Sequence, residues 1–111
     1  MKGCVFCRIL NRELPAEIID EDEEIAALRD INPQAPVHVL VIPKKHLPTV
    51  EDADANITGK LIVKAAELAG SLGISEKGYR LVINCREHAG QTVGHLHVHI
   101  LGGRWFSWPP G

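Results

Sequence analysis

The chain has 111 residues, of which 45% are apolar and 23% charged, and its formal charge is −2. That length suits one small domain, and the composition excludes a disordered or collagen-like chain. The basic residues are scattered and the longest apolar runs have the length of a strand, so we expect no nucleic-acid surface and no membrane-spanning segment.

The first residues, Met1 to Cys4, contain one lysine and no apolar run of the length found in signal peptides. We therefore expect a cytoplasmic protein. In a reducing compartment, its three cysteines are thiols or metal ligands rather than a disulfide framework.

The first half of the chain predicts one short helix and three strands. Apolar spacing, β-branched residues and prolines set their limits. The helix covers Phe6–Leu10, a hairpin with an acidic turn covers Glu17–Asp20 and Ile25–Leu28, a loop covers Asn32–Pro36, and a strand covers Val37–Ile42 and is stopped by Pro43.

The second half predicts a long helix from about Thr58 to Leu72, because apolar residues recur there at three- and four-residue steps. Strands over Tyr79–Asn84 and Gly94–Leu101 follow. Strands and helices do not alternate, which favours an α+β fold with a mainly antiparallel sheet of about five strands. We expect residues 1–111 to form a single domain.

Three of the six histidines, His95, His97 and His99, fall at alternate positions. On a strand they share one face, about 6.5–7 Å apart, while the apolar residues between them enter a core. A solvated strand face or a fortuitous metal-binding tract is the alternative. Three histidines in register, with a Gly-Gln-Thr loop before them, favour a functional site.

The pattern of histidines alternating with apolar residues resembles the signature of the histidine-triad (HIT) superfamily. The resemblance extends over nearly the whole chain and is closest to the Hint branch of nucleoside phosphoramidases. The matching segments are Asp30–Pro36, His38–His46, Gly78–Arg80, Asn84, Gly90–Thr92 and Trp108–Gly111.

The resemblance implies that a phosphorus–nitrogen bond on a purine nucleotide is hydrolysed through a covalent nucleotidyl intermediate on His97. An imidazole suits this task because it is nucleophilic near pH 7 and leaves readily. A backbone carbonyl from the same strand region is expected to hold the other ring nitrogen. His99 would contact a phosphate oxygen or the departing group, and His38 would support His99 from behind, unless it is merely a satisfied polar residue of the sheet.

The resemblance also implies a set of substrate-binding residues. Asp30 would hold the ribose hydroxyls, although it also suits a turn before Pro33, and apolar residues would enclose the base. Thr92 replaces the serine usual in the Hint branch but keeps the hydroxyl. The expected substrate-binding residues are Phe6, Ile9, Leu28, Asp30, Ile31, Asn84, Gly90, Gln91, Thr92 and Trp108.

The pair Cys4 and Cys7 has the spacing of metal ligands, but two cysteines are half a site. Two ordinary thiols are the alternative, and a redox pair needs a βαβ unit that the predicted elements lack. Resemblance to bacterial HIT proteins adds His46 and His95. Two thiolates and two imidazoles form a closed tetrahedral set, so we expect one structural zinc ion per chain. Cys85 and His88 match no motif and are taken as a packing and a surface residue.

Three other functions remain open. They are hydrolysis of dinucleoside polyphosphates, nucleotide binding with little turnover, and metal storage. The resemblance further implies a homodimer in which Trp108 and the C-terminal tail reach toward the partner's site. The aromatic tail, Trp105–Gly111, is too short to fold alone, so we expect it to pack on its own domain or on a second subunit.

Overall fold

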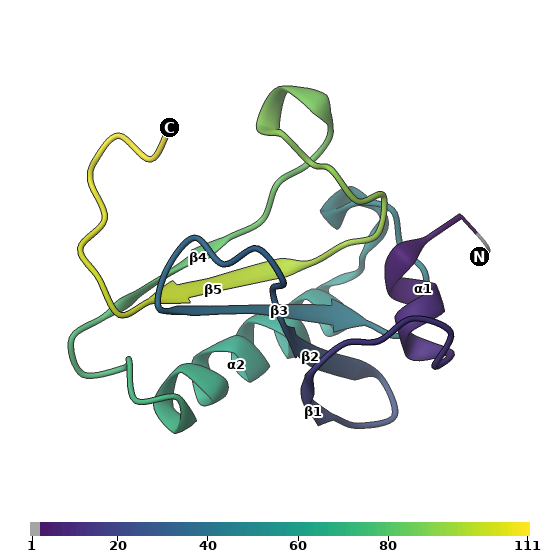
Figure 1. Cartoon of the computed structure of the whole chain (residues 1–111). Coiled ribbons are helices and arrows are strands. Elements are labelled where there is room, and N and C mark those ends of the chain that lie inside the picture. The colour runs from purple at the N-terminus through teal and green to yellow at the C-terminus, as the bar shows by residue number, and fades with distance from the viewer. Residues whose placement is uncertain (1–2) are drawn as a thin grey trace.

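A computed structural model describes residues 3–111. It contains one five-stranded sheet with the strand order β1-β2-β3-β5-β4, in which every neighbouring pair is antiparallel (Figure 1). The predicted α+β fold is confirmed. Met1 and Lys2, which were used to judge whether the chain begins with a signal peptide, lie outside the described residues. The elements are α1 (Val5–Leu10), β1 (Ile18–Glu21), β2 (Ile25–Arg29), β3 (Val37–Pro43), η1 (Val50–Asp52), α2 (Ala55–Ser71), β4 (Tyr79–Val82), η2 (Glu87–Ala89) and β5 (Val98–Gly102).

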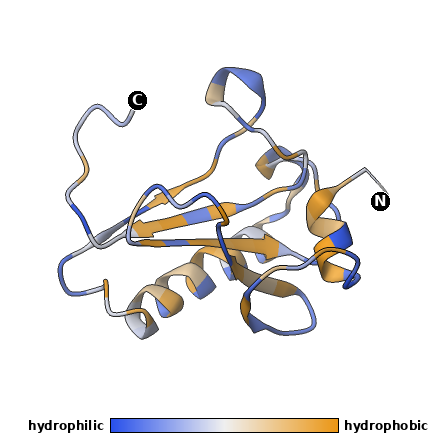
Figure 2. Ribbon diagram, in the orientation of Figure 1, coloured by the Kyte–Doolittle hydropathy of each residue, from blue (hydrophilic) through white to orange (hydrophobic). Residues whose placement is uncertain are grey.

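The two faces of the sheet have separate apolar cores. Along β3, Val39 and Val41 belong to the core that includes α2, whereas Leu40 and Ile42 belong to the core that includes α1. The alternation of side chains along a strand produces this division. Hydrophilic segments interrupt the otherwise hydrophobic strands β3 and β5 (Figure 2). His38 of β3 and His99 of β5 lie on the same face of the sheet as Leu40, which is the face toward α1.

The long helix begins three residues earlier than its apolar pattern indicates. It starts at Ala55 because the Asp54 side chain accepts a hydrogen bond from the Ile57 amide at 2.9 Å and caps the helix. The predicted end is confirmed within one residue, with Leu72 as the C-cap and Gly73 at a φ of 78°. Gly73 adopts this left-handed conformation without the steric cost of a Cβ atom.

Strands β4 and β5 are shorter than predicted. β4 ends at Val82 rather than Asn84, and β5 begins at Val98 rather than Gly94. The segment before Val98 leaves the sheet and bonds instead to the chain that follows β3. The Leu96 amide donates to the carbonyl of Leu47 at 2.6 Å, and His95 Nε2 donates to the carbonyl of Pro43 at 2.8 Å. His95 and His97 therefore precede the strand, while His99 lies on it.

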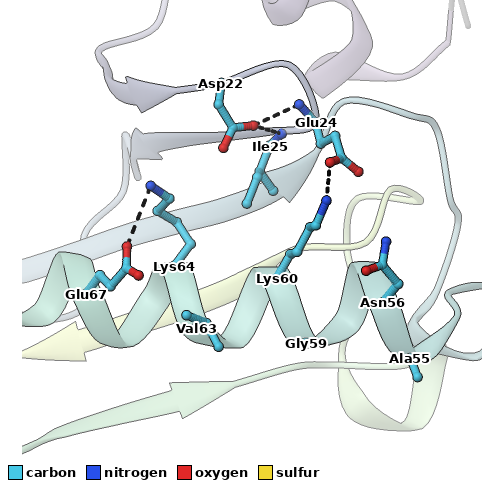
Figure 3. Close-up of a pocket in the computed structure, with 10 residues that line it drawn as sticks. All are labelled: Asp22, Glu24, Ile25, Ala55, Asn56, Gly59, Lys60, Val63, Lys64 and Glu67. Carbon is cyan, nitrogen blue, oxygen red and sulfur yellow. Dashed lines mark hydrogen bonds and ion pairs between the residues drawn. The ribbon is translucent and has the colours of Figure 1, made fainter.

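A groove of about 560 Å³ separates α2 from the turn between β1 and β2 (Figure 3). Charged side chains line it, and they pair with one another. Lys60 pairs with Glu24, and Lys64 lies 3.8 Å from Glu67. Lys64 also lies 3.1 Å from Asp20 of β1, which is outside the groove lining. The groove contains no histidine, so we interpret its ion pairs as fastening the hairpin to the helix. Within residues 3–111, no helix is long and apolar enough to cross a membrane.

Candidate active site and metal centre

His97 immediately precedes β5, and its imidazole is held in one tautomer. Its Nδ1 is 2.7 Å from the backbone carbonyl of His95. A carbonyl can only accept, so Nδ1 carries the proton and Nε2 keeps its lone pair. The side chain is buried, with 6% of His97 exposed. The carbonyl expected from the sequence as an orienting partner is confirmed, and it leaves Nε2 as a nucleophilic atom.

A chain of hydrogen bonds fixes the tautomer of His99. The backbone amide of Gln34 donates to His38 Nδ1 at 3.0 Å, so the proton of neutral His38 sits on Nε2. His38 Nε2 in turn donates to His99 Nδ1 at 2.9 Å. The proton of His99 is therefore on Nε2, where it can be donated to a ligand. The predicted support of His99 by His38 is confirmed as a direct contact.

His38 and His99 both have a lowered pKa and are neutral at pH 7. Burial, together with the nearby His97 and His38 rings, lowers the pKa of His99 to about 4. Burial also lowers the pKa of His38, against the opposite effect of the Asp30 carboxylate. The ring centroids of His97 and His99 are 4.9 Å apart. One free imidazole lone pair and one free N–H group thus stand side by side.

Asp30 borders the same group. One carboxylate oxygen lies 3.3 Å from His38 Nε2, and the other accepts a hydrogen bond from the Asn32 amide at 2.8 Å. The two interpretations made from the sequence are therefore compatible. One oxygen stabilises the turn, while the carboxylate also stands beside the histidines, where a ligand's hydroxyl groups can reach it.

Four side chains with ligand-type atoms, Cys4, Cys7, His46 and His95, meet beside His97. Cys4 Sγ and Cys7 Sγ lie 3.3 and 3.7 Å from His95 Nδ1. His46 Nδ1 lies 3.3 Å from Cys7 Sγ and 3.2 Å from His95 Nδ1. A tetrahedral zinc ion with bonds of about 2.0–2.3 Å separates its ligand atoms by roughly 3.3–3.8 Å. The four side chains can therefore hold a metal ion of this kind.

The protonation of these groups fits the same conclusion. His95 donates its Nε2 proton to the Pro43 carbonyl, which leaves Nδ1 free to bind a metal. Burial raises the pKa of the Cys7 thiol, and the neighbouring Cys4 raises it further. A buried pair of thiolates needs a compensating positive charge, and a divalent cation supplies one.

A second cluster with ligand-type atoms, formed by Asp30, His38 and His99, does not fit a metal. A metal on His38 Nε2 would move the His38 proton to Nδ1. There it would face the N–H group of Gln34, which already donates to that atom. The cluster is therefore a hydrogen-bonded relay, and the set that contains the two cysteines is the candidate metal centre.

The loop between β4 and β5 carries Asn84, Gly90, Gln91 and Thr92. The Gln91 side chain accepts from the Arg86 amide at 2.8 Å and donates to the carbonyls of Pro48 and Val93 at 2.8 and 3.0 Å. These bonds use both its amide protons, so the Gln91 side chain organises the loop. Thr92 is exposed and Asn84 is half-buried, and both are free of protein hydrogen bonds within the described residues.

The apolar residues expected to contact the nucleotide base are buried to different extents. Phe6, Ile9 and Leu28 are buried in the core that includes α1, whereas Ile31 is 94% exposed. The Phe6 ring stands edge-on to the His97 ring, with centroids 5.2 Å apart. Ile9 also borders a depression of about 380 Å³. The sequence analysis did not single out the other apolar residues of this depression, Leu14, Pro15, Ala16 and Ile18.

The C-terminal tail packs on its own domain through one aromatic ring. Phe106 lies between two guanidinium groups, 5.2 Å from Arg80 and 4.2 Å from Arg104. Trp105 and Trp108 are 97% and 82% exposed, and the tail projects away from the sheet (Figure 1). Cys85, expected to be a packing residue, instead contacts the exposed Glu51 and Arg86. His88 is exposed, as expected.

A family model that describes the HIT domain matches residues 11–105. The chain belongs to the HIT family. It is 56% identical over 110 residues to an uncharacterized HIT-like protein of Synechocystis sp., covering 96% of both chains. It is 47% identical over 103 residues to the purine nucleoside phosphoramidase of Escherichia coli, covering 90% of this chain and 87% of that protein.

Solved structures agree with this assignment. A HIT family hydrolase from Legionella pneumophila superposes with a TM-score of 0.93 at 48% identity, covering 97% of this chain and 99% of that one. A HIT family hydrolase from Clostridium thermocellum superposes with a TM-score of 0.90 at 52% identity, covering 94% and 93%. The resemblance stated from the sequence is confirmed, and this HIT protein is a hydrolase.

The sequence indicated the side chains of the candidate site and one orienting carbonyl, but it missed two other backbone groups that orient them. The amide of Gln34 and the carbonyl of Pro43 each fix a histidine tautomer. Such groups exist at nearly every position, so no residue type marks them in a sequence. The prolines around them were the available signal, because they predict an irregular chain with unpaired backbone groups.

Proposed function

We propose that this HIT hydrolase cleaves the P–N bond of purine nucleoside 5′-phosphoramidates, with the amine conjugates of AMP or GMP as its substrate class. One observation carries the proposal: the His97 imidazole is locked with a free Nε2 lone pair beside the Nε2–H group of neutral His99. The relative from Escherichia coli that is named a purine nucleoside phosphoramidase supports the choice of substrate.

In the first step, the lone pair of His97 Nε2 forms a bond to the α-phosphorus while the bond from phosphorus to the amine breaks. The departing amine takes a proton from water. The imidazole of the nucleotidyl intermediate carries positive charge, which the His95 carbonyl stabilises through the Nδ1–H bond. In the second step, water attacks the phosphorus and gives a proton to the hydroxide left by the first step, while the P–Nε2 bond breaks and His97 leaves as neutral imidazole.

His99 serves in this scheme as a hydrogen-bond donor to a phosphate oxygen. Its pKa of about 4 keeps it neutral at pH 7, and a neutral imidazole does not readily give up its remaining proton. Of the two contacts expected from the sequence, the phosphate oxygen is therefore favoured over the departing amine. Donors that stabilise charge on the phosphoryl group lower the barrier. The side chains of Asn84 and Thr92 are proposed to act in the same way. The amides of Gly90 and Gln91, also expected at the phosphate, already donate to the carbonyls of Glu87 and Arg86 at 3.0 and 3.1 Å, so these two residues are proposed to shape the loop.

The nucleoside is proposed to bind along the surface between Asp30 and the apolar residues of α1. Asp30 would accept hydrogen bonds from the ribose hydroxyls. The buried side chains of Phe6, Ile9 and Leu28 would form the floor beneath the base, and the exposed Ile31 would cover it. The buried floor presents hydrocarbon alone, so it gives no means of separating adenine from guanine.

We propose zinc as the ion held by Cys4, Cys7, His46 and His95. When bound, it would neutralise the two buried thiolates and fasten the start of α1 to the segment before β5. All four positions of a tetrahedral ion would be filled, so the centre is structural. Metal analysis of protein purified without chelator is expected to give one zinc per chain, and a value well below one would contradict this assignment.

We also propose a homodimer, because Trp105 and Trp108 are too exposed to be explained by the single chain. Each tail would reach the partner's site, and deletion of Trp105–Gly111 is expected to change substrate preference. The single domain over residues 1–111 and the cytoplasmic location stay predictions.

A turnover assay tests the proposed function. Wild type, His97→Ala and the exposed-histidine control His88→Ala would each be given adenosine phosphoramidate and a diadenosine polyphosphate. We expect wild type and His88→Ala to cleave the phosphoramidate, and His97→Ala to lose at least about a thousand-fold in rate. Preference for the polyphosphate would indicate that the protein is instead a dinucleoside polyphosphate hydrolase. Nucleotide binding without turnover of either compound would indicate a binding protein.

A further inference from the structure

The metal centre and the catalytic histidine share one short segment of chain. His95 is a ligand of the four-residue cluster through Nδ1, and its backbone carbonyl accepts the Nδ1 proton of His97 at 2.7 Å. The ring of His95 is completely buried, and Pro43 fixes its other nitrogen. A displacement of the His95 side chain therefore moves the carbonyl that orients His97.

Phe6 provides a second connection between the two sites. It lies between the ligands Cys4 and Cys7 on α1 and is 5% exposed. Its ring contacts both imidazoles edge-on, with centroids 5.6 Å from His95 and 5.2 Å from His97. The ligands hold the backbone of α1 on either side of Phe6, so the ring is placed by the same residues that bind the metal.

We propose that Phe6 is a positioning residue that, together with the His95 carbonyl, makes the orientation of the His97 imidazole depend on the Cys4/Cys7/His46/His95 metal centre. The inference rests on the proposed function only for its effect on rate. Loss of the metal frees the start of α1 and the His95 ring. Phe6 then no longer presses on the His97 ring, and the ring leaves the orientation in which Nε2 faces the phosphorus.

The metal centre and His97 are coupled through two contacts. The Phe6 ring packs against the His97 imidazole, and the His95 carbonyl accepts a hydrogen bond from it. Close-packed interiors transmit small displacements because side chains there have few alternative positions. A misplacement of about 1 Å at a reacting atom can reduce a rate by about a hundred-fold. Phe6 also belongs to the proposed floor beneath the base, but a leucine at this position keeps that floor apolar. Phe6→Leu is thus expected to affect the rate of the chemical step more than substrate binding.

The test compares Phe6→Leu with Leu10→Ala in the zinc-loaded protein. Leu10 lies on the same helix and packs against the same core, but it is not part of the site. We expect Phe6→Leu to retain one zinc per chain and to lose at least about ten-fold in kcat, with KM within about two-fold of wild type. Leu10→Ala is expected to keep the kcat of wild type.

A spectroscopic measurement reports the orientation of His97 without turnover. In protein labelled with ¹⁵N-histidine, the hydrogen-bonded Nδ1–H group of His97 is expected to give one sharp resonance in zinc-loaded wild type. The resonance should broaden or split in loaded Phe6→Leu and in wild type stripped of zinc, but not in loaded Leu10→Ala. The amide signals of Val39 and Val41, which lie in the opposite core, show in each sample that the sheet remains folded.

Two results would overturn the inference. One is a zinc-loaded Phe6→Leu protein with the His97 resonance and kcat of wild type. The other is a folded, zinc-free wild type that keeps the sharp resonance. If Phe6→Leu fails to hold zinc, the zinc-free wild type decides the question. If wild type cleaves no phosphoramidate, the proposed function fails, but the resonance comparison still decides whether the metal centre orients His97.

Discussion

Acidification should destabilise the protein through His99, and the size of the effect follows from its burial. The pKa of His99 is lowered to about 4 in the folded chain, mainly by burial, whereas an unfolded histidine titrates near 6.5. Between these values the unfolded state binds more protons than the folded state. Stability contributed by neutral His99 is therefore complete above about pH 6.5 and is lost as the pH falls toward 4.

The magnitude can be worked out for a change from pH 7.5 to pH 5.0. A pKa difference of about 2.5 units makes the free energy of unfolding fall by roughly 2 kcal/mol over this range. Partial exposure of His99 reduces the figure to about 1–2 kcal/mol. With an unfolding entropy of about 2.1 cal/mol/K per residue, this is a decrease in Tm of roughly 4–9 °C.

The assay is thermal unfolding at the two pH values for wild type, His99→Gln and His88→Gln. A glutamine oxygen at position 99 can still accept the proton of His38, but the side chain does not titrate. We expect the decrease in Tm between pH 7.5 and 5.0 to be smaller by about 4–9 °C in His99→Gln than in wild type. His88 is exposed, so its variant should behave as wild type. An equal decrease in wild type and His99→Gln would refute the idea that burial keeps His99 neutral.

Three further predictions concern the loop before β5 and the metal centre. Arg86 has a φ of 68° and a ψ of −169°, a region that is essentially restricted to glycine, so Arg86→Gly should raise Tm by about 4 °C in a thermal melt. In Gln91→Glu, the new side chain can accept from the Arg86 amide but cannot donate to the carbonyls of Pro48 and Val93. Hydrogen exchange of the backbone amides of residues 84–94 should therefore accelerate. Unchanged exchange would contradict our account of this loop. Cys4→Ser should lower both zinc content and Tm, and chelator should lower the Tm of wild type but not of Cys4→Ser.

The sequence predicted the elements of this fold because most of them depend on local patterns. The apolar stripe identified α2, and the β-branched run over Val37–Ile42 identified β3. The predicted helix start was wrong by three residues because Asp54 lies outside the apolar stripe, and its capping role depends on the turn that follows it. A cap is visible in a sequence only when the helix it precedes has already been located.

The site was predicted less completely, for two physical reasons. The resemblance identified side chains such as His97 and Cys4, and the structure brings the metal ligands together. The hydrogen-bonding use of Gln91 and the contacts of Phe6 could not be predicted, since each depends on residues distant in the chain. Gln91 bonds to Pro48, and Phe6 contacts His97. Residue type alone does not show whether a side chain faces the ligand or its own loop.

Strand β5 begins at Val98, four residues later than predicted, and Pro43 explains the difference. Val41 pairs with Val98 at the end of the β3–β5 ladder. The next positions on β3 lead to Pro43, which has no N–H group, so the ladder cannot continue through it. A carbonyl that is not used in the sheet is available to a side chain. The His95 carbonyl lies in the segment that has left the sheet, and it accepts the proton that fixes the tautomer of His97.

The proline that ends β3 therefore also affects how His97, the proposed nucleophile, is oriented. A regular strand from Gly94 onward would place the three histidines on one face, as the sequence suggests, but would use their backbone in pairing. The irregular segment keeps the alternation, since Leu96 and Val98 still enter the core against α2. It also lets the Pro43 carbonyl hold the metal ligand His95. One interruption of the sheet thus supplies oriented imidazoles to both the metal centre and the proposed nucleophile.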